Sequence, residues 1–254
     1  MLLSEQPFEA FSGSHGIAVF VLIVLTVWLL RRVRSHPQLS HLKLRIVLAI
    51  LLIASTFSDI INPLLRFETG AYTLVHENGY PLYLCDIAAY VLAYALLQKN
   101  QRFTEIGYVW ALAGTLQGLV TPMLVYDWPS IEFITFFTQH GSIPMVAIIA
   151  VYGFGWKPER GAFARVWIWT WVFMVTVMLF NFLANTNYSF LNGSPSYPTG
   201  IDYLGPYPWY LLSLHGVTFV LYVILMLPYR KRGVFDVKHI AIFGQGCEPD
   251  VEPK

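Results

Sequence analysis

Seven hydrophobic stretches, each close to the roughly 20 residues that a helix needs to cross a bilayer, constrain this chain more than any other feature. Turn-forming residues such as proline and glycine separate them. The chain is 56% hydrophobic and 12% charged, whereas about 25% of the residues in soluble domains are charged. The sequence therefore predicts an all-α, polytopic membrane protein. The expected transmembrane helices cover residues 12–30, 44–65, 81–98, 106–125, 133–154, 164–185 and 207–228, within a domain of residues 1–228 that precedes a tail of residues 229–254.

The positive charges predict how this domain is oriented, because cytoplasmic loops hold lysine and arginine in excess. Every lysine and arginine except Arg66 lies after the first, third, fifth or seventh stretch, near the ends that would share one side of the membrane. We therefore expect an N-terminus outside, a cytoplasmic C-terminal tail, and a multi-pass protein of the cell membrane.

Charge and cysteine content exclude several other classes of protein. The net charge is +1, and no basic block is interleaved with aromatic residues outside short loops, so we expect no nucleic-acid partner. Cys85 and Cys247 lie far apart and form no CxxC pair, which predicts neither a disulfide framework nor a metal site. We expect no cofactor. The N-terminal segment is acidic and lacks a small-residue cleavage site, so the first helix is expected to stay in the protein.

Polar side chains inside the predicted helices share one depth, in the half of the bilayer that faces outward. Hydrocarbon disfavours such groups, so they turn toward the bundle interior or a wet cavity. A shared depth therefore predicts one polar chamber, although hydrogen bonds that merely join helices are an alternative for the amides. The residues at this depth are Asp59, Asn62, Cys85, Asp86, Gln117, His140, Asn181, Asn185, Asn187 and His215.

A thiol, histidines and carboxylates together are the components of nucleophilic catalysis. A cysteine nucleophile needs a base that takes its proton and a group that orients this base. Cys85 lies about one turn into its helix, where the helix dipole favours the thiolate, whereas the charge of Asp86 opposes it. Asp59 and Asp86 are the carboxylates well inside the predicted helices, and acids at such positions indicate functional sites. A single cysteine is, however, more often an inert small hydrophobic residue.

Five motifs follow one another along the hydrophobic part of the chain: YPLYLCD, WALAGTLQGLVTP, FFTQHG, NFLANTNYSFLNGSP and DYLGPYPWY. In order and spacing, from about residue 15 to residue 228, they resemble the bacterial YwaF-type integral membrane proteins and their animal relative, transmembrane protein 164. The resemblance implies seven helices and an acyltransferase that moves a fatty acyl chain between phospholipids, with ether phosphatidylethanolamine as one acceptor. It maps the active cysteine of the family's LPLHLCD motif to Cys85 and the histidine of its HG motif to His140. Tyr83 stands where the family often has histidine.

The resemblance leads to a mechanism in which Cys85 attacks a lipid ester and forms a thioester. His140 would take the thiol proton and return it to the leaving alcohol, and Asp86 or Asp59 would orient His140. The partners expected are membrane lipids, as acyl donor and acceptor. Candidate hydrogen-bond donors to the tetrahedral oxyanion are Asn185, Asn187 and Gln117.

Other functions also suit seven helices around a polar chamber. One alternative is a transporter or receptor for a small molecule. Another is a haem or quinone protein that uses His15, His140 and His215, but these histidines occur one per helix, without the pairing that would favour it. The connection 187–209 is long and predicts either a lid over the site or an ordinary packed loop.

Overall fold

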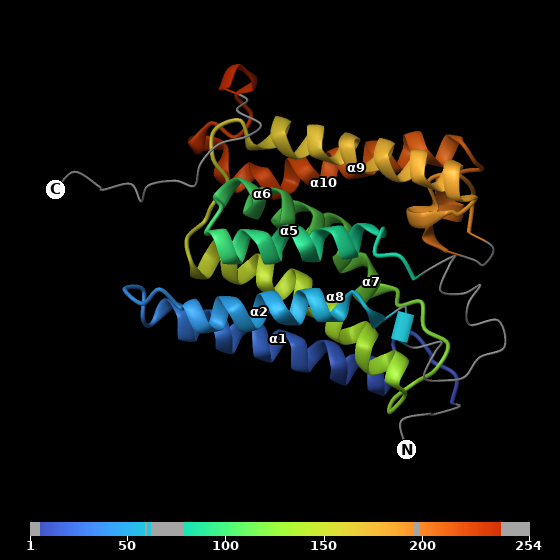
Figure 1. Ribbon diagram of the computed structural model, residues 1–254, viewed down its shortest axis with the longest axis horizontal. Coiled ribbons are helices and arrows are strands. Elements are labelled where there is room, and N and C mark those ends of the chain that lie inside the picture. The colour runs from blue at the N-terminus through green and yellow to red at the C-terminus, as the bar shows by residue number, and fades with distance from the viewer. Residues whose placement is uncertain (1–5, 59, 62–78, 196–198, 240–254) are drawn as a thin grey trace.

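The computed structural model describes residues 6–58, 60–61, 79–195 and 199–239, and this part of the chain forms a bundle of helices (Figure 1). The prediction of an all-α protein with seven helical rods is confirmed, where a rod is one helix or several joined end to end. The rods are α1 (Gly13–Arg34); α2 (Leu42–Ser55); α5 (Leu84–Gln98); α6 (Gln101–Trp110) with η1 (Ala111–Thr115) and α7 (Leu116–Val120); α8 (Ile131–Ile148) with η2 (Ile149–Gly153); α9 (Ala162–Ala184); and α10 (Trp209–Met226) with η5 (Leu227–Arg232). Short 3₁₀ turns are η3 (Tyr188–Phe190), η4 (Gly200–Leu204) and η6 (Val237–His239).

Within the described residues, four helical segments are long and apolar enough to cross a membrane: 13–34, 131–153, 162–184 and 209–232. Helices α9 and α10 leave much of their apolar surface exposed, including Leu179, Phe182 and Val220. Soluble monomers rarely expose such large continuous apolar surfaces. This exposed hydrocarbon surface, on helices long enough to cross a bilayer, indicates a membrane protein.

Helices α2 and α5 are shorter than the hydrophobic stretches predict. Helix α2 ends at Ser55 rather than near residue 65, and Asp59 and Asn62 lie outside the described residues. Helix α5 begins at Leu84 and has 15 residues, so it extends about 22 Å, whereas the hydrocarbon layer is about 30 Å thick. The ends of α5 do not need to reach the membrane surface, because neighbouring helices bury one side of this helix along its length.

The hydrophobic core is built around α5, which lies between α2 and α8 on one side and α9 and α10 on the other (Figure 1). Ala89, Leu92 and Leu96 form a fully buried stripe along α5 at helical spacing. Leu92 packs directly on Gly107, where a Cβ atom would lie 2.5 Å from its Cδ2 atom. This glycine allows α5 and α6 to approach closely, as small residues do between membrane helices.

A buried ion pair ties the rods together at the end of the bundle that carries most lysines and arginines, here called the basic end. Nη2 of Arg165 in α9 lies 2.8 Å from Oε2 of Glu105 in α6, and both side chains are buried. The backbone N–H of Glu159 donates to the same carboxylate at 2.7 Å. The two oxygens of Glu105 therefore hold α9 and the loop before it against α6. Which side of the membrane the basic end faces stays a prediction.

Part of the predicted tail packs onto the basic end. The backbone N–H of Phe163 donates to the carbonyl of Val234 at 3.1 Å, and that of Gly161 donates to the carbonyl of Gly233 at 3.1 Å. Val234 is fully buried in the main core. Residues 233 and 234 are thus packed against the start of α9, while the division into a domain and a tail stays a prediction.

Candidate functional site

A chain of buried hydrogen bonds joins α5, α8 and the segment that follows α2, and we call its three members, Ser58, Asp86 and Gln139, the Asp86 network. Nε2 of Gln139 donates to Oδ1 of Asp86 at 2.6 Å, and Oγ of Ser58 donates to Oε1 of Gln139 at 3.4 Å. The backbone N–H of Tyr83 donates to Oδ2 of Asp86 at 3.1 Å. Asp86 is the third residue of α5, a position where a carboxylate caps free N–H groups and is favoured by the helix dipole. Both carboxylate oxygens therefore accept hydrogen bonds in a site closed to solvent.

Cys85 precedes Asp86 on the first turn of α5, is half-buried and forms no disulfide within the described residues. It lies on the same face of the helix as Ala89 and Leu92, one and two turns further on. Because Leu92 packs on Gly107 of α6, this face is turned toward the fourth rod, made of α6, η1 and α7. Leu84 packs on the same rod at Gly114, where a Cβ atom would lie 2.5 Å from Cδ2 of the leucine.

His140, on α8, also contacts the fourth rod, because its ring packs on Gly118 of α7. The ring stacks on Phe136 with centroids 4.1 Å apart, and Nδ1 donates to the carbonyl of Phe136 at 3.2 Å. A carbonyl oxygen only accepts hydrogen bonds, so the proton of the neutral ring is on Nδ1. Nε2 therefore carries the lone pair that a general base needs.

The starts of α5 and His140 thus contact one short stretch of the fourth rod. Gly114 and Gly118 are one helical turn apart, and they receive Leu84 and His140 respectively. The Asp86 network joins the same two helices from a third direction, through the residues next to Cys85 and His140. Sequence reasoning placed Cys85, Asp86 and His140 at one depth, and that they act together in a reaction stays a prediction.

His215 and Gln117 lie elsewhere in the bundle. Nδ1 of His215 donates to the carbonyl of Leu211 at 2.7 Å, and its ring contacts Trp171 and Trp167 with centroids 4.9 Å and 6.3 Å away. The structure therefore places His215 between α10 and α9. Gln117 is exposed on α7. From these positions neither side chain contacts the Asp86 network, so the supporting role predicted for both residues has no contact behind it.

Asn181 and Asn185 shape the turn that follows α9. The side-chain amide of Asn181 donates to the carbonyl of Tyr188 at 2.9 Å, and its oxygen accepts from the Tyr188 N–H at 2.8 Å and from Oγ1 of Thr186 at 3.0 Å. Asn185 ends the helix in the left-handed conformation, with φ of 55°, which asparagine tolerates better than most residues. These contacts favour the structural alternative that the sequence left open for both asparagines.

The loop after α9 packs on the segment that leads into α5. Asn187 holds the loop closed by donating to the carbonyl of Gly193 at 2.8 Å. The hydroxyl of Tyr188 accepts a hydrogen bond from the backbone N–H of Tyr80 at 3.0 Å. The ring of Tyr83, the residue before α5, lies edge-on to Tyr188 with centroids 5.4 Å apart. Residues 186–193 therefore form a packed cover over the start of α5.

His15 links α1 to the end of α7. Its Nδ1 accepts from the backbone N–H of Phe11 at 2.9 Å, so the ring proton is on Nε2, which donates to the carbonyl of Leu119 at 2.9 Å. The residue is buried. Both ring nitrogens are used in these contacts, which favours a structural role over the ligand role considered from the sequence.

Sequence reasoning missed Ser58, Gln139 and Thr115. Gln139 could have been found, because it precedes His140 and lies at the depth that selected the other polar residues. Thr115 could not have been found, because the feature that singles it out, a buried hydroxyl in a π-helical turn, depends on the backbone geometry.

The buried hydroxyl of Thr115 has no hydrogen-bond partner within the described residues. Thr26 and Thr170, in α1 and α9, donate to the carbonyl four residues earlier, at 2.7 Å and 2.8 Å. For Thr115 that carbonyl belongs to Ala111, and in the π-helical turn η1 it accepts from the backbone N–H of Leu116. Such turns occur often at functional sites. The turn leaves a donor at the stretch of the fourth rod that Leu84 and His140 contact.

Comparison with known proteins identifies one family. Residues 10–226 match the TMEM164 family. The matched segment begins before α1 and ends with α10, so it includes the whole bundle and both Cys85 and His140. No curated protein and no solved structure matches the chain.

Proposed function

The chain belongs to the TMEM164 family, and from this premise and the groups around Cys85 we propose that it is a cysteine-dependent acyltransferase acting on membrane lipids. The observation that carries the proposal is the contact of two helices with one stretch of the fourth rod. Leu84, next to Cys85, packs on Gly114, and His140 packs on Gly118 one turn later. Cys85 shares its face of α5 with Leu92, which packs on Gly107 of the same rod, so the thiol and the imidazole belong to two helices that both contact this rod.

The proposed reaction has two balanced steps. Sγ of Cys85 attacks the carbonyl carbon of a lipid ester while Nε2 of His140 takes the thiol proton. The tetrahedral intermediate collapses to a thioester, and the leaving lysolipid alcohol receives the proton. In the second step the hydroxyl of an acceptor lysolipid gives its proton to His140 and attacks the thioester. The products are a new ester and the free thiol of Cys85.

Three features of the site support these roles. The hydrogen bond from Nδ1 of His140 to Phe136 leaves Nε2 able to accept a proton. Asp86 holds Gln139, the residue before His140, and so positions the turn of α8 that carries the base. The hydroxyl of Thr115 is a better candidate donor to the oxyanion than the amide of Asn187, which already donates to Gly193.

We further propose that the basic end faces the cytoplasm of a cell-membrane protein, as the distribution of lysine and arginine indicates. Cys85 and the Asp86 network would then react with lipids in the outward half of the bilayer. A membrane-impermeant maleimide tests this orientation. Cys247, in the C-terminal part of the chain, should react only after cells are opened, and labelling in intact cells would reverse the orientation.

Trapping the thioester tests the proposed function. The purified protein in liposomes is incubated with a phospholipid that carries an alkyne-tagged acyl chain. We expect the tag on Cys85, removable by neutral hydroxylamine, and its loss in Cys85→Ala. Cys247→Ala is the matched control and should keep the tag, because the proposal assigns the thioester to Cys85 alone. Equal hydroxylamine-sensitive labelling of Cys85→Ala and wild type would overturn the proposal.

A further inference from the structure

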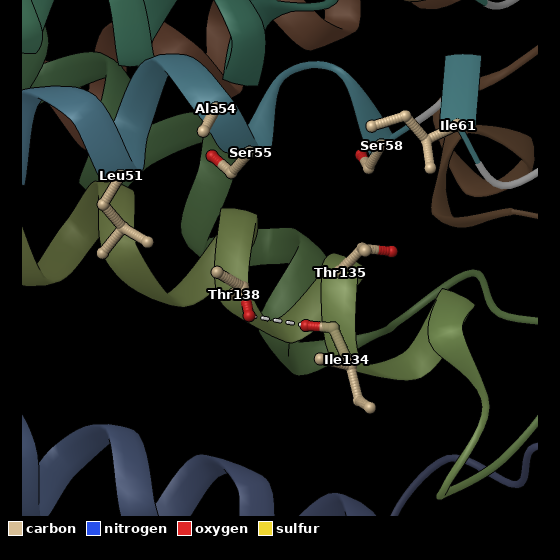
Figure 2. Close-up of a pocket in the computed structure, with 8 residues that line it drawn as sticks. All are labelled: Leu51, Ala54, Ser55, Ser58, Ile61, Ile134, Thr135 and Thr138. Carbon is tan, nitrogen blue, oxygen red and sulfur yellow. Dashed lines mark hydrogen bonds between the residues drawn. The ribbon is translucent and has the colours of Figure 1, made fainter. Parts of the chain in front are cut away.

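A groove of about 210 Å³ lies between the end of α2 and the start of α8. Figure 2 shows Leu51, Ala54 and Ile61 on its α2 side, opposite Ile134 of α8. Of these, Ala54 and Ile61 are exposed, so the groove opens on the surface of the bundle.

The hydroxyl groups in the groove walls are already used within their own helices. Oγ of Ser55 donates to the carbonyl of Leu52 at 2.9 Å, and Oγ1 of Thr135 donates to that of Ile131 at 2.9 Å. Oγ1 of Thr138 donates to the carbonyl of Ile134 at 2.6 Å, as the dashed line in Figure 2 marks. No charged side chain is among the described residues that line the groove. A polar ligand would lose its hydration here without replacement, whereas a hydrocarbon chain would not.

The floor of the groove leads to the candidate site. Ser58 lines the groove and is buried, and its hydroxyl donates to Gln139 of the Asp86 network. Gln139 in turn donates to Asp86, the neighbour of Cys85. A hydrogen-bonded path through Ser58 and Gln139 therefore connects the groove wall with the first turn of α5.

The surface around the opening is apolar as well. Val47 and Ile50, on the outer face of α2, are each 61% exposed. In a membrane protein such a face contacts acyl chains. Both the opening of the groove and its interior therefore suit a hydrocarbon chain.

We propose that this groove binds one acyl chain of a membrane phospholipid and directs its ester toward Cys85. The binding part of this inference stands on the groove itself, and the direction toward Cys85 rests on the proposed function. Contact with bulk lipid alone would give no preferred place for the chain, whereas a groove fixes it between α2 and α8.

Photocrosslinking tests the binding part without any reaction at the thiol. The Cys85→Ala variant is placed in liposomes with a phosphatidylethanolamine that carries a diazirine in an alkyne-tagged acyl chain, and crosslinked peptides are identified by mass spectrometry. We expect peptides from 51–61 and 134–138 to be enriched about tenfold over the α10 peptide around Val220, which is exposed to bulk lipid. Equal labelling of all lipid-facing helices would overturn the inference.

Matched variants separate filling of the groove from general damage. Ala54→Phe fills the groove from an exposed position, so it should fold, and it should reduce groove crosslinking about tenfold. Val47→Phe places the same phenylalanine ring two turns earlier on the same face, outside the groove lining, and should leave crosslinking unchanged. The inference is wrong if Ala54→Phe crosslinks like wild type. If Ala54→Phe loses groove crosslinking, the groove is supported even if Cys85 forms no thioester. If Ala54→Phe keeps both its crosslinking and its thioester, the groove is excluded and the proposed function remains.

Discussion

Gly118 offers a way to displace His140 without removing any functional group. In Gly118→Ala the new Cβ atom would lie 3.0 Å from Nε2 of His140 and closer still to Cδ2. Carbon atoms in normal contact are about 3.5–4 Å apart, so the ring has to move by about 1 Å. The ring cannot yield by rotation alone, because it stacks on Phe136 and donates to the Phe136 carbonyl.

The expected magnitudes separate an effect on the reaction from an effect on folding. Overpacking costs about 1–3 kcal/mol, and replacing glycine by alanine in a helix returns about 1 kcal/mol. The free energy of unfolding should therefore fall by about 0–2 kcal/mol. A displacement of about 1 Å of a catalytic group can slow a reaction about 100-fold. We expect Gly118→Ala to remain folded and to acylate Cys85 about 100-fold more slowly.

The assay is the rate at which Cys85 takes the tag from an alkyne-tagged phospholipid, per amount of folded protein. Gly107→Ala is the control, because Gly107 lies in the same rod as Gly118 but its new Cβ atom would lie 2.5 Å from Leu92 of α5 instead of against His140. It should be destabilised similarly and should keep the wild-type rate. The reasoning fails if Gly118→Ala reacts at the wild-type rate, or if Gly107→Ala is slowed to the same extent.

Substitutions at Asp86, Glu105 and Thr115 test the Asp86 network, the buried ion pair and the hydroxyl of Thr115. Asp86→Ala should lower the free energy of unfolding by about 1–3 kcal/mol, because the amide of Gln139 loses its acceptor; thermal unfolding in detergent that matches wild type would contradict this. Glu105→Ala should cost about 3–5 kcal/mol by leaving Arg165 buried and unpaired, and Arg165→Met in the same chain should recover part of the loss. Thr115→Val should not lower stability, since no partner within the described residues is lost, but it should slow Cys85 acylation about 100-fold if the hydroxyl stabilises the oxyanion; an unchanged rate would exclude that role.

The helical rods were predictable, because every helix that crosses the bilayer needs about 20 apolar residues, and hydropathy along the sequence shows such stretches. The ends of α2 and α5 were not predictable from hydropathy. Much of α5 is buried against other helices, and the length of α5 depends on these neighbours, which are far away in the sequence. The rotation of α10 about its axis was equally hidden. That helix is apolar on all sides, so the sequence did not indicate that His215 faces Trp171 of α9.

The candidate site was predictable in depth and not in detail. Cys85, Asp86 and His140 share a level that can be counted along each helix. Hydrogen-bond partners depend on which faces meet, so Gln139 was overlooked, and Asn181 and Asn187 turned out to build the loop after α9. Thr115 lies in η1, where backbone pairing is shifted by one residue, and its hydroxyl has no hydrogen-bond partner within the described residues. No local sequence pattern indicated this shift.

The shortness of α5 has a chemical consequence for any acyl group carried by Cys85. A helix of 15 residues covers about 22 Å of a layer of about 30 Å, so its first turn can start below the water boundary. The loop of residues 186–193 packs on the segment that leads into that turn. A thioester formed there would meet the hydroxyl of a neighbouring lipid far more often than a water molecule, so the modest length of one helix would favour transfer over hydrolysis.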